Sequence, residues 1–232
     1  MGVEGREVEF QVSGKTVRGY LAAGEGAASQ PGLILVHEWW GLNEHVKDLT
    51  RRFAGEGYVV LAPDLYDGAS TKDPDEAGKL MQGLDKTEAL EKLDGAVAYL
   101  QGLPAVDKEK IGVTGFCMGG TYALLLAAHN TSVKASAPFY GDVPTDDELK
   151  HLSAPVLFIG AENDFWITKE KMDRLDEGLK KHGKEGEVKV YEGVGHAFFN
   201  DTRPEAYDKD AAEDAWRRVT SFFAENLKSA AR

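Results

Sequence analysis

The chain has little cysteine and no long hydrophobic run. Cys117 is its only cysteine among 232 residues, which excludes an intrachain disulfide and is typical of a reducing compartment. Its longest apolar stretches, such as residues 124–128, are far shorter than the roughly 20 residues that cross a bilayer. Residues 1–6 lack the apolar core of a signal peptide, and Arg6 does not fit a myristoylation signal. The sequence therefore predicts a cytoplasmic protein.

Positive charge is also scarce. The chain has 27 Lys and Arg against 39 Asp and Glu, for a formal net charge of -12. Nucleic acids and anionic membranes bind clustered Lys and Arg, so neither is expected as a partner. A small molecule is the expected ligand. Self-association is not encoded in any visible pattern, and we expect a monomer or a weak homodimer.

Short aliphatic runs alternate with helical patterns along the chain. Residues 6–22 predict a hairpin that turns at Ser13 and Gly14, and residues 64–84 predict a loop with a short helix. The other expected strands are 33–36, 58–61, 111–114, 133–139, 156–159 and 188–191. The other expected helices are about 44–55, 90–100, 121–130, 168–182 and 205–227. This alternation predicts one α/β domain over 1–232, a mainly parallel sheet with helices on both faces. In such a fold, functional residues gather at the carboxyl ends of the strands.

The lone cysteine lies in a motif with a recognisable chemistry. Residues 115–120 read Gly-Phe-Cys-Met-Gly-Gly, after a β-branched run and before a helical stretch. This is the nucleophile-elbow pattern G-x-S-x-G with Cys117 in place of serine. The glycines leave room for a tight strand-to-helix turn, and the start of the helix favours a thiolate at the turn. The alternative is a small buried core residue, the usual fate of an isolated cysteine.

A thiolate nucleophile needs a base and a group that orients the base. His196 lies in a glycine-rich loop after the last expected strand, and Asp164 follows the strand at 156–159. The order Cys117, Asp164, His196 is that of the α/β-hydrolases. Glu162 and Asp142 are competing carboxylates. The remaining candidates are interpreted as ordinary structural or surface histidines: His45, His129, His151 and His182.

An oxyanion hole for acyl transfer needs two backbone donors. We expect one to be the N–H of Met118, directly after the nucleophile, and the other to come from Trp39, in the loop after strand 33–36. Glu38 lies in the same loop, and its spacing alone leaves open whether it is a surface acid or a functional one.

These segments together resemble the dienelactone hydrolase (carboxymethylenebutenolidase) family. The resemblance runs over nearly the whole chain, and it rests on the segments 37–41 (HEWWG), 62–66 (APDLY), 115–120 (GFCMGG), 162–164 (END) and 195–198 (GHAF). It implies an α/β-hydrolase fold, a Cys117–His196–Asp164 triad, and ester or lactone hydrolysis through a thioester without metal or cofactor. It also implies that Glu38 contacts the resting cysteine and helps to deliver the thiolate.

The sequence departs from the lactone-specific members where they hold a substrate carboxylate. The position four residues after His196 is Asn200 instead of arginine, the nearest arginine is Arg203, and residues 67–92 contain no arginine. Lysine is a poor substitute for the planar guanidinium fork. We therefore expect a small neutral ester or lactone, held by Trp39, Tyr140, Phe198 and Arg203. The alternatives are a thiol redox or electrophile sensor and a non-catalytic ligand-binding protein of the same fold.

Overall fold

The structure is a computed structural model that describes residues 3–24 and 29–228. Met1 and Gly2, on which part of the signal-peptide and myristoylation predictions rest, lie outside the described residues. The chain divides into two compact parts, residues 1–112 and 113–232, which are described in turn. The prediction of one domain over 1–232 stays a prediction.

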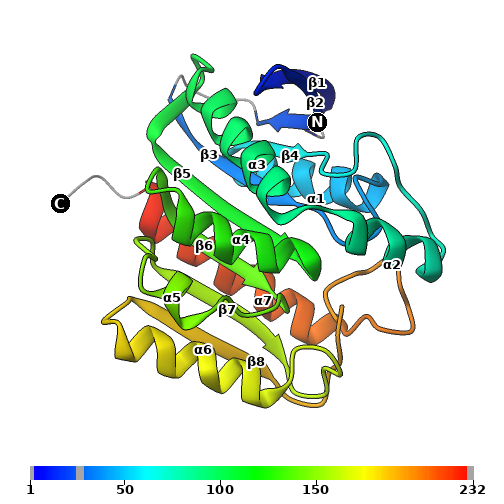
Figure 1. Cartoon of the computed structure of the whole chain (residues 1–232), viewed down its shortest axis with the longest axis vertical. Helices are drawn as coiled ribbons and strands as arrows, with labels where there is room; N and C mark the ends of the chain where they lie inside the picture. Colours follow the sequence, from blue (N-terminus) through cyan, green and yellow to red (C-terminus); the bar gives the residue numbers. More distant parts are fainter. Residues whose placement is uncertain (1–2, 25–28, 229–232) are drawn as a thin grey trace. The chain divides into compact units, whose positions relative to one another are not determined.

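The first part contains the hairpin and the first helices. Its elements are β1 (Gly5–Val12), β2 (Lys15–Ala23), β3 (Gln30–Val36), α1 (Glu44–Gly55), β4 (Val59–Pro63), α2 (Pro74–Gly83), α3 (Lys86–Gln101) and the first residues of β5 (Val106–Phe116). The strand order is β1-β2-β4-β3-β5, with β3 and β4 parallel and the β1–β2 and β2–β4 pairs antiparallel. Helix α1 packs on β2 and β4, and α3 packs on β1, β3 and β4 (Figure 1).

The second part begins within β5 and contains the elbow. Its further elements are α4 (Met118–His129), β6 (Val133–Phe139), α5 (Asp146–Leu149), β7 (Val156–Ala161), α6 (Lys169–Lys181), β8 (Gly186–Tyr191), α7 (Lys209–Phe223) and the π-helical turn η1 (Ala224–Lys228). The order is β5-β6-β7-β8, and the pairs β6–β7 and β7–β8 are parallel. Helix α4 packs on β6, α6 on β8 and α7 on β7 (Figure 1).

The predicted α/β class and the mainly parallel pairing are confirmed, and the differences lie at element ends. The last helix begins at Lys209 instead of about 205, because the Asp208 carboxylate accepts the Ala211 N–H and caps it there. The acidic connection at 142–152 contains the short helix α5, which a capping box between Thr145 and Glu148 stabilises.

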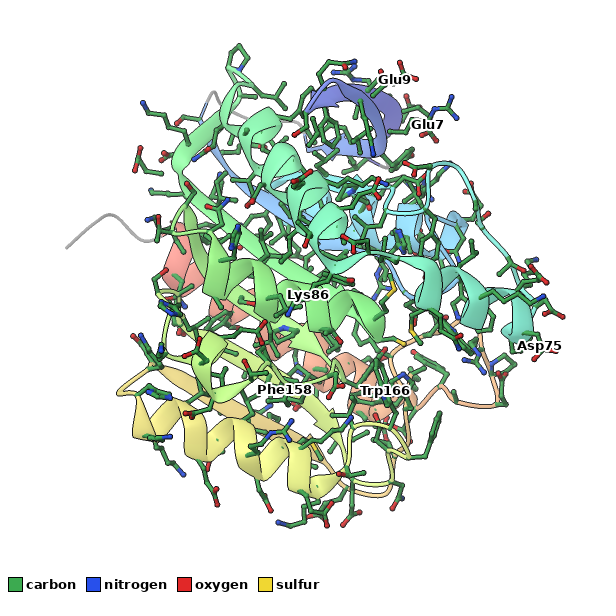
Figure 2. The ribbon with its side chains drawn as sticks, viewed as in Figure 1. Glu7, Glu9, Asp75, Lys86, Phe158 and Trp166 are labelled. Atoms are coloured by element: carbon green, nitrogen blue, oxygen red, sulfur yellow. The ribbon has the colours of Figure 1, made fainter. Side chains whose placement is uncertain are left out.

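Side chains follow the burial that the sequence pattern predicts. Phe158 lies within β7 and is fully buried, whereas Glu7, Glu9 and Asp75 are exposed on β1 and α2 (Figure 2). Over the residues that the structure describes, no helix is long and apolar enough to cross a membrane.

Candidate active site

The strand, tight turn and helix that the motif predicts are present around Cys117. Strand β5 ends at Phe116, α4 begins at Met118, and Cys117 between them has φ 57° and ψ -121°. A non-glycine residue with this backbone stores about 1–3 kcal/mol of strain, so the surrounding structure must hold it. The Cys117 N–H donates to the Phe139 carbonyl at 3.1 Å, and the Cys117 carbonyl accepts the Gly120 N–H at 2.9 Å. The thiol is free of disulfides and 7% exposed.

Two glycines of the segment 115–120, Gly115 and Gly120, are required by close backbone approaches. A Cβ at Gly115 would lie 2.1 Å from the Gly119 carbonyl oxygen, and one at Gly120 would lie 2.4 Å from the Phe139 oxygen. The helix start therefore packs directly on the ends of β5 and β6. This contact fixes the position of Cys117 at the carboxyl end of β5.

The structure brings together the predicted base and acid. The Nδ1 atom of His196 lies 2.7 Å from Oδ2 of Asp164. The other carboxylate oxygen, Oδ1, accepts the backbone N–H groups of Trp166 at 2.8 Å and Ile167 at 2.9 Å. These bonds use both oxygens of a side chain that is fully buried, so the carboxylate is held in one orientation. A carboxylate at Nδ1 places the ring proton there and leaves Nε2 with a lone pair.

Aromatic side chains surround the imidazole. The ring of Tyr140 lies 4.9 Å from that of His196, centroid to centroid, and those of Phe165 and Trp166 lie at 5.7 and 5.6 Å. Trp166 belongs to the loop that joins β7 to α6 (Figure 2). Tyr140 is fully buried, and Phe165 is 85% exposed, the one large hydrophobic side chain so exposed among the described residues. The imidazole of His196 therefore lies near both a buried and an exposed aromatic side chain.

The competing carboxylates are engaged elsewhere. Glu162 accepts the Gly193 N–H at 2.8 Å, and Asp142 accepts the Val143 N–H at 2.9 Å and pairs with Lys171 at 2.9 Å. Asp164 is thus the acid that contacts His196, as the sequence order predicts.

The other histidines lie apart from this arrangement. His129 and His151 are exposed, and His182 contacts Asp146 at 2.9 Å, as expected of surface residues. His45, in contrast, is buried on the first turn of α1, because it lies on the same helix face as the core residue Leu49.

The expected substrate residues are placed as follows. Phe198 is fully buried, against Tyr140 and Tyr191. Arg203 pairs with Glu205 at 2.8 Å. Asn200 is buried, and its side-chain oxygen accepts the Thr202 N–H at 3.0 Å, so it closes a turn of its own loop. The contacts of Tyr140, Trp39, Phe198 and Arg203 with substrate stay predictions.

The predicted residues Glu38 and Trp39 belong to the first part of the chain, directly after β3. Residues 38–41 form a β-turn in which the Glu38 carbonyl accepts the Gly41 N–H at 3.1 Å. Glu38 is 2% exposed, so it is not the surface acid that its spacing left open. His37, which precedes it, is fully buried and hydrogen bonded at both ring nitrogens. The sequence interpretation missed His37; a polar residue directly after four aliphatic residues was the signal that could have found it.

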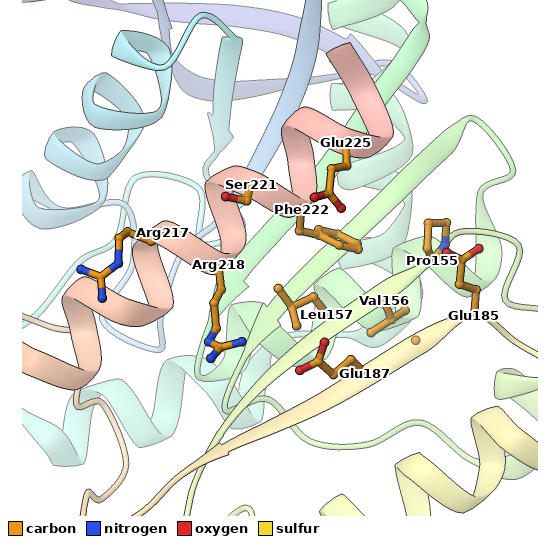
Figure 3. A pocket seen from close by; sticks show the side chains of 11 residues that line it. Pro155, Val156, Leu157, Glu185, Glu187, Arg217, Arg218, Ser221, Phe222 and Glu225 are labelled. Carbon is orange, nitrogen blue, oxygen red and sulfur yellow. The ribbon is translucent and has the colours of Figure 1, made fainter. Parts of the chain in front are cut away.

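A separate groove of about 500 Å³ lies at the other end of the strands in the second part. It is formed by residues at the beginnings of β7 and β8 and by α7 and η1 (Figure 3). Its two arginines, Arg217 and Arg218, pair with Asp214 at 3.1 and 2.7 Å. Cys117, Asp164 and His196 all follow carboxyl ends of strands, so this groove is not their substrate pocket.

Comparison with known proteins agrees with the fold. A provisionally named dienelactone hydrolase from Klebsiella pneumoniae has a solved structure that superposes with a TM-score of 0.90; it is 29% identical, over 97% of this chain and all of that chain. A dienelactone hydrolase-like promiscuous phosphotriesterase from metagenomic libraries also superposes at 0.90, but at 23% identity this shows the fold alone. The fold is that of the α/β-hydrolases.

Sequence comparison identifies the family. Residues 17–227 match the dienelactone hydrolase family. "Protein usf" of Aquifex pyrophilus is 39% identical over 96% of this chain and 99% of that protein. A provisionally named carboxymethylenebutenolidase of Aquifex aeolicus is 37% identical over 97% of this chain and its own full length. The chain belongs to the dienelactone hydrolase family of hydrolases.

Proposed function

We propose that this hydrolase cleaves small neutral carboxylic esters or lactones, with Cys117 as nucleophile, His196 as base and Asp164 as the orienting acid. The observation that carries the proposal is the 2.7 Å contact between His196 and the buried Asp164, in a chain whose elbow presents Cys117. Nucleophile, base and acid each follow the carboxyl end of a strand, β5, β8 and β7.

The proposed reaction has two halves. The Cys117 sulfur attacks the ester carbonyl, and His196 Nε2 holds the proton that the thiol gives up. When the tetrahedral intermediate collapses, the C–O bond breaks, His196 protonates the leaving alkoxide, and a thioester remains. His196 then takes a proton from water, the hydroxide attacks the thioester, and the acid leaves as the thiol recovers its proton. Asp164 keeps the proton of the neutral ring on Nδ1 and stabilises the imidazolium.

Backbone donors would stabilise the oxyanion in both halves. We assign this role to the N–H of Met118, the first residue of α4, and to the N–H of Trp39. Glu38, by its likeness to the family glutamate, would keep the resting cysteine in reserve until substrate binds. Its burial is compatible with this role, since a glutamate is almost never fully buried unless it is paired inside the protein.

The proposed substrate is uncharged because the arginines expected of lactone-specific relatives are missing from the matching positions of this sequence. Arg203 is paired with Glu205, and Asn200, at the family's arginine position, is used by its own turn. We also propose a cytoplasmic location and a monomer or weak homodimer, on the single cysteine and the acidic composition.

The proposal is tested with a chromogenic acetate ester. The Cys117→Ala and His196→Ala variants should lose at least about 10³-fold in kcat, because members of such a triad act as a unit. His182→Ala is the matched control, a partly exposed histidine hydrogen bonded to Asp146, and should keep wild-type kcat. Rapid acid quench of the wild-type enzyme should trap an acetyl group on Cys117, detected by mass spectrometry.

Two results would contradict the proposal. Equal turnover by wild type and Cys117→Ala would remove Cys117 from the chemistry. No turnover, with rapid alkylation of Cys117 at neutral pH, would favour the thiol sensor; no turnover with slow alkylation would favour a ligand-binding protein.

A further inference from the structure

We propose that His37 is a positioning residue that orients the peptide bond between Glu38 and Trp39 and so aims the Trp39 N–H. The inference rests on the proposed function, in which that N–H is an oxyanion donor. The contacts that carry it all lie in the first part of the chain.

The ring of His37 makes two hydrogen bonds of opposite direction. Its Nε2 accepts the Leu65 backbone N–H at 3.1 Å, so Nε2 carries no proton. The proton is therefore on Nδ1, which lies 2.6 Å from the Glu38 carbonyl oxygen and donates to it. His37 thus links the loop after β3 to the loop after β4. It does so as a neutral ring with its proton on Nδ1.

The carbonyl that His37 holds controls the neighbouring N–H. In a trans peptide, the C=O of Glu38 and the N–H of Trp39 lie in one plane and point in opposite directions. The described peptide bonds are all trans. Fixing the Glu38 oxygen therefore fixes the direction of the Trp39 N–H.

The rest of the turn is held in the same orientation. The Gly41 N–H donates to the Glu38 oxygen at 3.1 Å, and the Thr71 N–H donates to the Trp40 oxygen at 3.0 Å. Gly41 has φ +90°, and a Cβ there would lie 2.5 Å from the Ala69 oxygen. The turn is therefore restrained at both ends, and His37 supplies the side-chain restraint on its first carbonyl.

The loop after β4, which contains Leu65, is also restrained by hydrogen bonds. The carboxylate of Asp64 accepts the N–H groups of Tyr66 at 2.9 Å and Gly68 at 2.6 Å. Lys92 donates to the Leu65 carbonyl at 3.2 Å and to Asp67 at 2.8 Å. The His37 ring also lies 5.0 Å from that of Tyr66. The Leu65 N–H that binds His37 Nε2 therefore belongs to a restrained loop.

The neutral form of His37 is favoured by its surroundings. Burial lowers the pKa of His37; its bond to the Glu38 carbonyl and the charge of Asp64 act in the opposite direction, and Lys92 adds to the lowering. A protonated ring could not accept the Leu65 N–H, because both nitrogens would then be donors.

Two substitutions separate the two bonds of His37. The amide of asparagine places its N–H₂ near the position of Nδ1, so His37→Asn keeps a donor to the Glu38 oxygen. The amide of glutamine reaches near Nε2, so His37→Gln keeps a partner for Leu65 and loses that donor. We expect His37→Asn to keep kcat within about threefold, and His37→Gln to lose about 10- to 100-fold in kcat with KM within about twofold, since misaiming an oxyanion donor weakens only transition-state binding.

A second measurement keeps the inference separate from the proposed function. The backbone amide of Trp39, followed by nitrogen-15 NMR, should shift in His37→Gln and stay near its wild-type position in His37→Asn. Equal kcat losses in both variants that track their melting temperatures, or an unmoved Trp39 amide in both, would overturn the positioning role. An amide that shifts as expected in an enzyme without ester turnover would keep the positioning role and refute the proposed function.

A pH readout follows from the sign of the pKa shift. Because the folded pKa of His37 is lowered, its contribution to stability is fully present above its unfolded pKa of about 6.5 and is lost as the pH falls below that value. The free energy of unfolding should fall between pH 7 and 5 less steeply in His37→Asn than in the wild type. His45→Asn, a second buried histidine, is the control for loss of a buried ring.

Discussion

At the scale of single residues, backbone strain marks the ends of the strands that carry the proposed site. Cys117, Tyr140 and Ala197 have φ values of 57°, 35° and 66°, although none is glycine. Each lies at or beside a proposed reacting group: Cys117 is the nucleophile, Tyr140 packs on the base, and Ala197 follows it. Strain of about 1–3 kcal/mol at each position persists only where the surrounding fold determines it. These residues are thus held in place at a cost to stability.

Phe165 gives a prediction at the same scale. Its side chain is 85% exposed and its ring lies 5.7 Å from that of His196, so it can cover a bound ester but supports no core. Phe165→Ala should raise KM for a butyrate ester by about 5- to 20-fold with kcat within twofold, the effect of losing about 1–2 kcal/mol of apolar contact.

The melting temperature of Phe165→Ala should stay unchanged, since little burial is lost. A large fall in melting temperature, or unchanged kinetics, would show that the side chain serves the fold instead. Phe158→Ala is the contrasting variant, because Phe158 is fully buried in β7 and its loss should cost about 3–5 kcal/mol.

At the scale of elements, the strand–turn–helix unit of β5 and α4 depends on backbone contact. Thr114 donates to the Ala137 carbonyl at 2.8 Å, and Ser136 donates to the Ala123 carbonyl at 3.2 Å, so side chains bind β5 and α4 to β6. The glycines of the elbow allow these elements to meet without side chains between them. The glycine spacing of the motif is therefore explained by this close backbone packing.

A pair of glycine substitutions tests this packing. A Cβ at Gly120 would lie 2.4 Å from the Phe139 oxygen, whereas one at Gly78 in α2 meets nothing within 4 Å. Gly120→Ala should destabilise the protein by about 3 kcal/mol or more and abolish turnover, because backbone must move. Gly78→Ala should stabilise it by up to about 1 kcal/mol with unchanged kcat, since alanine is the better helix former. Urea unfolding of both variants checks this; equal effects would refute the packing argument.

At the scale of the whole molecule, charge should govern which substrates are accepted. The chain carries a net charge of -12, and the arginines expected of lactone-specific relatives are absent from the matching positions. We therefore expect an anionic ester to be repelled at long range and to lack an arginine clamp at short range. A neutral ester is not repelled by the net charge and needs no arginine clamp.

The dependence of kcat/KM on ionic strength tests whether charge repulsion limits the reaction of an anionic ester. For an ester with a carboxylate, kcat/KM should rise severalfold between 10 and 200 mM salt, because the Debye length falls from about 30 Å to below 10 Å. For the uncharged ester of the same shape it should change by less than about twofold. A high kcat/KM for the anionic ester that falls with salt would instead show that cationic side chains bind its carboxylate.

The elements and the candidate site residues could be predicted from the sequence alone, because both follow from local patterns. Aliphatic runs marked the strands, the Gly-x-Cys-x-Gly spacing marked the elbow, and chain order favoured Asp164 over Glu162 as the partner of His196. Observed helix ends differ from the predicted ones where a side chain such as Asp208 caps the backbone, because hydrophobic periodicity carries no information on capping.

The partner of each polar side chain, in contrast, could be read only from the folded chain. The engagement of Glu162 and Asp142 elsewhere, the turn closed by Asn200, and the two bonds of His37 join residues through folded loops. His37 was missed because its function lies in a tautomer set by Leu65, 28 residues further along the chain. Local patterns suggest a candidate nucleophile and base, whereas the positions of the carbonyls and N–H groups around them exist only once distant loops have packed.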